Sequence, residues 1–63
     1  MVRLTRINHK PLVLNAELIE HIEASPDTVI TMTNGQKFVV IETGEEVVAK
    51  VLDYQRSVRG REN

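Results

Sequence analysis

The chain has 63 residues, of which 41% are hydrophobic and 27% charged, and eight basic against nine acidic side chains leave a formal charge of −1. This balance gives no general reason to expect affinity for nucleic acid or for an anionic membrane. No apolar run approaches the roughly 18 residues that cross a bilayer, so we expect no membrane insertion and one domain over residues 1–63. The absence of cysteine excludes disulfides and thiolate catalysis and fits a reducing cytoplasm.

The small size of the chain limits its hydrophobic core. A domain of this length buries only about 60% of the surface that its unfolded chain exposes. Small scaffolds usually need disulfides, a metal ion, self-association or an unusually well-packed core. Because cysteine is absent and only one Phe and one Tyr can fill the centre, we expect a homo-oligomer.

The chain opens with a predicted hairpin. Val2–Ile7 is short and rich in β-branched residues, and Asn8–Pro11 reads as a turn. Leu12–Leu14 suits the returning strand, which Pro11 can begin but could not join in a central position. We interpret His9 as a turn residue that tolerates a positive φ.

Residues 15–24 are ambiguous between a helix and a strand. Asn15 is a good helix cap, and the leucine and isoleucines that follow recur at helical spacing. Against a longer helix stands Ser25-Pro26-Asp27, which is typical of a tight turn with Pro preset for its second position. We prefer one helical turn at Ala16–Leu18, followed by a strand at Ile19–Glu23.

A second hairpin is the clearest local signal. The strands Thr28–Thr33 and Gln36–Ile41 flank Asn34-Gly35, a dipeptide that accepts the positive φ values of a two-residue type I′ turn. Such a turn fixes the strand register. The expected opposed pairs are Thr33 with Gln36, Thr31 with Phe38, Ile30 with Val39, and Val29 with Val40.

Opposed residues of a sheet point to the same face, so this register predicts an interface. One face would carry Ile22, Val29, Phe38 and Val40, with Thr31 among them. The other would carry Ile19, His21, Ile30, Met32, Val39 and Ile41. A single helix can cover only one of two apolar faces, and an exposed apolar face usually marks an interaction site. We therefore expect Ile22, Val29, Phe38 and Val40 to form an interface; the alternative is a monomer whose first hairpin closes the sandwich.

The last part of the chain reads as an amphipathic helix from about Gly44 to Ser57. Thr43 and Glu46 have the spacing of a capping box. The expected apolar stripe contains Val47, Val48, Val51, Leu52, Gln55 and Val58. Residues from about 60 to 63 are expected to be disordered. The fold class is thus α+β, a small antiparallel β-sheet of about five short strands in hairpins followed by this C-terminal helix.

No motif for catalysis or for ligand binding is visible. His9 and His21 lack metal-ligand spacing. Ser25 has no nucleophile elbow and no base partner, and the glycines are too scattered for a phosphate loop. We therefore expect no enzyme, no catalytic or metal site, no cofactor and no small-molecule substrate.

Nucleic-acid binding is the alternative function. Basic residues cluster near both ends of the chain, at Arg3, Arg6 and Lys10 and at Arg56, Arg59 and Arg61. These clusters could form a basic stripe in an oligomer that regulates transcription or translation. Against this interpretation, no aromatic residues alternate with the basic ones for base stacking, and the net charge is slightly negative.

A series of motifs stands in a fairly specific order along the chain. It comprises Leu4-Thr5-Arg6-Ile7-Asn8, Leu14-Asn15-Ala16-Glu17-Leu18-Ile19-Glu20, Ile22-Glu23, Pro26-Asp27-Thr28-Val29-Ile30-Thr31, Asn34-Gly35, Glu45-Glu46-Val47-Val48 and Tyr54. On these motifs the chain resembles the small bacterial flagellar FlbD family, from Leu4 to about Arg56. Two positions depart from the family pattern: His9 stands where Gly is common, and Met32 where Leu is usual.

The resemblance implies a non-enzymatic accessory protein that supports flagellar motor power during swarming. It makes flagellar motor or stator proteins the expected partners, at the cytoplasmic side of the motor. It supplies no catalytic or ligand-binding residues. The polar positions shared with the family are Thr5, Arg6, Asn8, Asp27 and Thr28. Asn8, Asp27 and Thr28 suit turn geometry, and of the five positions we expect only Arg6 to be a contact residue.

Overall fold

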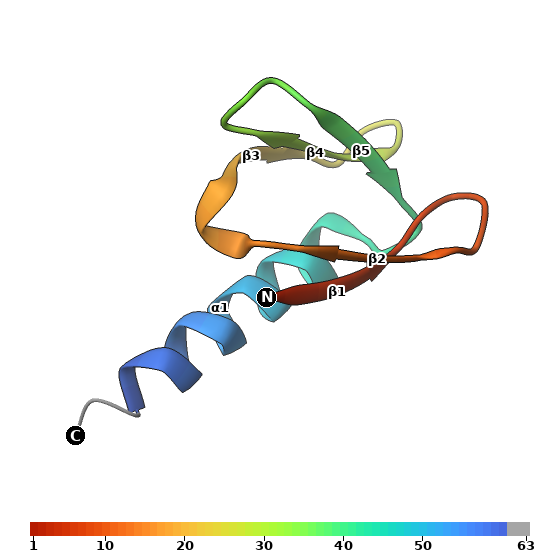
Figure 1. Cartoon of the computed structure of the whole chain (residues 1–63). Helices are drawn as coiled ribbons and strands as arrows, with labels where there is room; N and C mark the ends of the chain where they lie inside the picture. The colour runs from red at the N-terminus through yellow and green to blue at the C-terminus, as the bar shows by residue number, and fades with distance from the viewer. Residues whose placement is uncertain (61–63) are drawn as a thin grey trace.

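The computed structural model describes residues 1–60 (Figure 1). Its elements are β1 (Val2–Thr5), β2 (Pro11–Leu14), the 3₁₀ turn η1 (Ala16–Leu18), β3 (Ile19–Glu23), β4 (Thr28–Met32), β5 (Lys37–Val40) and α1 (Gly44–Gly60). Strands β1 and β2 form one antiparallel sheet, and β3, β4 and β5 form a second in that order. The predicted α+β class, with five strands before a C-terminal helix, is confirmed.

The two sheets meet at one corner, and the first hairpin folds over the second sheet. Arg6 forms an isolated antiparallel bridge with Val40, and the Ile41 amide donates to the Thr5 carbonyl at 3.0 Å. The resulting core takes side chains from both sheets and the helix: Val2, Leu4, Leu12, Leu14, Ala16, Ile30, Met32, Val40 and Val47. The first hairpin therefore closes the sandwich over the second sheet.

The local prediction for the link between the sheets is confirmed. The helical turn and β3 have the expected bounds, and the Asn15 side chain caps the turn by accepting from the Glu17 amide at 3.0 Å. The peptide bond between Ser25 and Pro26 in the next turn is cis.

The predicted register of the second hairpin is wrong by one residue. The Gly35 amide donates to the Met32 carbonyl at 2.9 Å, and the Met32 amide donates to the Gln36 carbonyl at 2.8 Å. Gly35 has a φ of 91°, whereas Asn34 does not have a positive φ. This is a three-residue loop that ends in a left-handed residue, not the type I′ turn, which needs two positive φ values. The observed pairs are Thr28–Val40, Val29–Val39, Ile30–Phe38 and Thr31–Lys37.

The first hairpin uses the same loop. The His9 amide donates to the Arg6 carbonyl at 2.8 Å, and the Arg6 amide donates to the Lys10 carbonyl at 2.9 Å. His9 takes the place that Gly35 has in the second loop, with a φ of 69°, which confirms it as a turn residue. The Asn8 side chain accepts from the Lys10 amide at 3.1 Å. Because this loop begins early, β1 ends at Thr5 rather than at the expected Ile7.

The corrected register changes what each face of the second sheet carries. Ile22, Ile30 and Phe38 lie opposite one another across the three strands, on the face that the first hairpin covers. The other face carries His21, Glu23, Val29, Thr31, Lys37 and Val39. The prediction that both faces are apolar is therefore wrong. The expected interface set does not share one exposed face, because Val29 lies on the opposite side and Val40 is only 3% exposed.

The helix begins as predicted, but only part of its apolar stripe is buried. The Thr43 amide donates to Glu46 Oε1 at 2.8 Å and the Glu46 amide to Thr43 Oγ1 at 3.1 Å, which confirms the capping box. Val47 is fully buried, and Val51 and Tyr54 follow it against the core. The remaining apolar positions of the stripe stay exposed. The helix reaches Gly60; residues 61–63, for which disorder was expected, lie outside the described residues.

Candidate functional site

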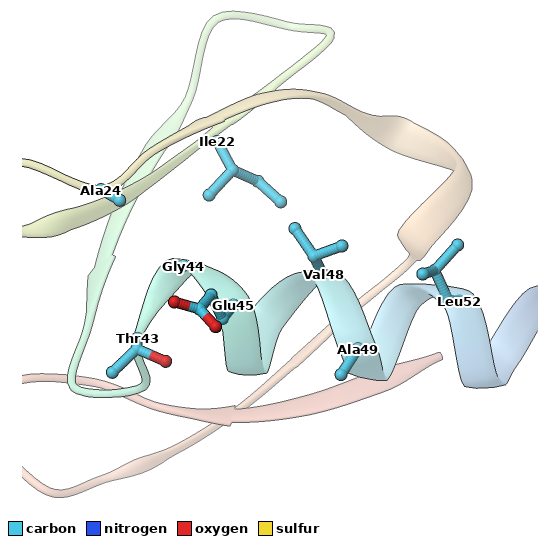
Figure 2. A pocket seen from close by; sticks show the side chains of 8 residues that line it. All are labelled: Ile22, Ala24, Thr43, Gly44, Glu45, Val48, Ala49 and Leu52. Atoms are coloured by element: carbon cyan, nitrogen blue, oxygen red, sulfur yellow. The ribbon is translucent and has the colours of Figure 1, made fainter.

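An open groove of about 670 Å³ lies between the N-terminal half of α1 and the end of β3 (Figure 2). Its lining residues are Ile22, Ala24, Thr43, Gly44, Glu45, Val48, Ala49 and Leu52. Figure 2 shows the side chains of Ile22 and Val48 pointing toward each other across the groove. The side chains of Val48 and Leu52 are 46% and 48% exposed. The groove is thus an uncovered apolar surface.

The groove exists because α1 starts close to the sheet and then presents a second apolar stripe. A Cβ atom at Gly44 would lie 2.8 Å from the Ala24 Cβ, so only glycine allows this approach without a shift of the backbone. Val48 and Leu52 are four residues apart and therefore lie on one side of the helix. That side is turned away from the stripe of Val47 and Val51, which faces β1 and the core.

Exposed carboxylates lie on the groove lining and on strand β3. Glu45 lines it, at the first turn of α1. On β3, the His21 Nδ1 atom lies 2.9 Å from Glu20 Oε1, and the His21 Nε2 atom lies 3.6 Å from Glu23 Oε1. All three of these β3 side chains are exposed. Within residues 1–60, no group of three or more His, Cys, Asp or Glu is placed to hold a metal ion.

A carboxylate clasp fixes the start of the helix relative to β1. The Thr5 amide and hydroxyl donate to the two carboxylate oxygens of Glu42, each at 3.0 Å. Burial disfavours the charged form of Glu42, but hydrogen bonds from the Thr5 and Glu42 amides and the Thr5 hydroxyl, with attraction from Lys50, outweigh it and lower its pKa. Glu42 could not be identified from the sequence, because no local pattern marks it as the partner of Thr5, which is 37 positions away.

We expect Glu42→Gln to make the free energy of unfolding less dependent on pH. A lowered folded-state pKa contributes stability above the usual carboxyl pKa, and this contribution is lost as the pH falls through the folded value. At pH 7 the variant should be less stable than the wild type by about 1 kcal/mol, and this gap should shrink toward pH 3. Urea unfolding at both pH values measures the gap, with Asp27→Asn as the control. A gap that is constant with pH would contradict the role of the Glu42 charge.

The predicted contact residue Arg6 lies outside the groove. Its guanidinium carbon is 5.4 Å from the centre of the Phe38 ring, which is a cation–π contact, and the side chain is exposed. Arg6 lines a shallow hollow with Lys37, whereas Arg3 lines a different hollow with Lys50. The two N-terminal arginines are thus not gathered into one basic surface.

The structure brings one of the four expected interface residues, Ile22, into the groove. Phe38 is half-buried beneath Arg6. Val29 lies on the opposite face of the sheet, and Val40 is buried in the core.

The sequence predicts Val48 and Leu52 in one stripe with Val47 and Val51, whereas the structure leaves Val48 and Leu52 exposed. The width of that stripe could have indicated this exposure. Six positions spread across one side of a helix are more than the core beneath the helix can cover.

Comparison of the chain with known protein families relates it to bacterial motility. A family model described as FlbD, flagellar and swarming motility proteins, matches residues 1–59. The matched range includes both hairpins and nearly all of α1. No curated protein and no solved structure matches the chain. Over residues 1–60, the helix is too short and too polar to span a membrane.

Proposed function

The chain belongs to the FlbD family of flagellar and swarming motility proteins, and from this premise we propose that it is a non-enzymatic accessory protein of the flagellar motor. It acts at the cytoplasmic side of the motor, where it supports motor power through contacts between proteins. The observation that carries the proposal is the uncovered apolar groove between α1 and β3. Flagellar motor or stator proteins are the partners that the family membership favours.

The chemistry of the groove supports docking rather than catalysis. Catalytic pockets combine enclosure with several convergent polar groups whose pKa values are shifted. Here the floor is aliphatic, and the Thr43 hydroxyl oxygen already accepts from the Glu46 amide in the capping interaction. Exposed apolar surface gathered in one place is costly to leave in water and marks a binding surface.

The proposal is tested by a charge placed in the groove. In a swarming bacterium that lacks the native gene, Leu52→Asp should reduce swarm expansion and motor torque to the level of the deletion strain. Leu52 is about half exposed (48%), so the variant should remain folded and as abundant as the wild type. Torque is measured from the rotation of a bead attached to a filament stub.

The matched control is Val13→Asp, at a site 57% exposed on the outer side of the first hairpin, which should preserve torque. Normal torque with folded Leu52→Asp would show that the groove is not the functional surface. Normal swarming and torque in the deletion strain itself would overturn the proposed function.

A further inference from the structure

We propose that the groove is occupied by a second copy of this chain, in a two-fold dimer whose α1 helices pack antiparallel. The inference rests on the function proposed above and names the occupant of the same surface. It depends on three features of the structure: the order of charges along the groove side of α1, the free length of the helix, and the size of the surface required.

The groove side of α1 has a self-complementary order of residues. Glu45, Val48, Leu52 and Arg56 follow one another at spacings of three, four and four, so they form one stripe along the helix. In an antiparallel pair, the acidic first turn of one copy faces the basic end of the other. The alignment that places Val48 opposite the second copy's Leu52 also places Glu45 within one residue of the position opposite its Arg56, an offset that the two long side chains can span. The charge pair and the apolar pair can thus form in the same arrangement, and two-fold symmetry repeats each of them.

Existing contacts do not compete strongly with this arrangement. Arg56 Nη2 lies 3.7 Å from Asp53 Oδ1, but both side chains are at least 75% exposed. An exposed pair of this kind contributes little to stability. Antiparallel alignment also places the positive end of each helix dipole beside the negative end of the other.

The shape of the molecule allows the helix to reach a partner. Figure 1 shows the C-terminal turns of α1 extending beyond both sheets. Val58 lies in these turns on the same side of α1 as Val51 and Tyr54, and it is 40% exposed. A standard interface needs about 800 Å² from each partner. That is about a sixth of the 4704 Å² surface of this chain, so the proposed dimer requires contact along the length of α1 as well as at the groove.

The test combines sedimentation equilibrium with variants in which Glu45 or Arg56 carries the opposite charge. The full-length wild type should sediment as a dimer of the 7.2 kDa chain at submillimolar concentration and dissociate on dilution. Leu52→Asp should weaken the dimer at least about a hundredfold, because it places two carboxylates in the apolar contact. Glu45→Arg and Arg56→Glu should each weaken it about tenfold. An equimolar mixture of the two charge variants should recover the wild-type affinity, because the mixed dimer forms both ion pairs, one with inverted sign and one as in the wild type.

The matched control is Lys10→Glu, which changes the net charge as Arg56→Glu does but lies in the first loop. It should dimerise as the wild type does. A wild type that stays monomeric at every concentration overturns the dimer. Weakening by the single charge variants without recovery in their mixture overturns the antiparallel arrangement.

The outcome is independent of the test of the proposed function. A monomeric wild type whose Leu52→Asp variant still loses motor torque would mean that another protein fills the groove; the function then stands and the dimer is overturned. A dimer with the expected charge dependence, combined with normal torque in Leu52→Asp, supports the dimer and overturns the role of the groove in motility.

Discussion

Ile30→Ala is expected to remove about 2–5 kcal/mol from the free energy of unfolding. Ile30 has no exposed surface and lies in the core beneath the first hairpin. A protein of this length has a total stability of only about 3–9 kcal/mol, so much of the variant population should be unfolded at 37 °C. Urea and thermal unfolding followed by circular dichroism measure the loss.

The neighbouring residue supplies the control for register. Val29 lies on the opposite face of β4 and is only partly buried, so Val29→Ala should cost about 1 kcal/mol or less. The two-residue turn expected from sequence would instead group Val29 with Phe38 and Val40. Equal losses for Ile30→Ala and Val29→Ala would therefore contradict the observed register.

Local signals predicted the order of elements because each depends on a few adjacent residues. The capping box of Thr43 and Glu46 and the Asn15 cap act within three positions of the chain. The register failed because Asn-Gly suits either of two loops. It can supply two positive φ values, or Gly can supply one at the end of a longer loop. A slip of one residue exchanges the two faces of a strand, so a small error in the turn misplaced the interface.

The sequence of the first loop indicates its loop type, whereas that of the second loop does not. Asn8 is followed by His9, which tolerates one left-handed position but makes a two-residue type I′ turn less favourable than glycine does. The same reasoning does not decide between the two loops at Asn34-Gly35, because glycine suits both of them. The groove could not be predicted locally either. It depends on where the sheets end beside α1 and on a clasp between Thr5 and Glu42, which are 37 positions apart.

Gly44→Ala is expected to destabilise the protein by about 1–3 kcal/mol, because it overpacks the start of the helix. The added Cβ would lie 2.8 Å from the Ala24 Cβ, which is closer than such atoms approach in proteins. Both atoms are attached directly to the backbone, so relief requires the start of α1 to move away from the sheet. Urea unfolding measures the loss of stability.

Ala24→Gly supplies the compensating change. The new Cβ at position 44 would then meet only the backbone of residue 24, since the Ala24 Cα is 3.9 Å away, an ordinary contact distance. The double variant should therefore be more stable than the sum of the two single losses implies, and the double-mutant cycle measures this coupling directly. Because Ala24 and Gly44 both line the groove, the single variant Gly44→Ala should also disturb motor torque more than its loss of stability explains. Simple additivity of the two substitutions would mean that the helix does not approach the sheet at Ala24, and the groove would then lack the wall that gives it its shape.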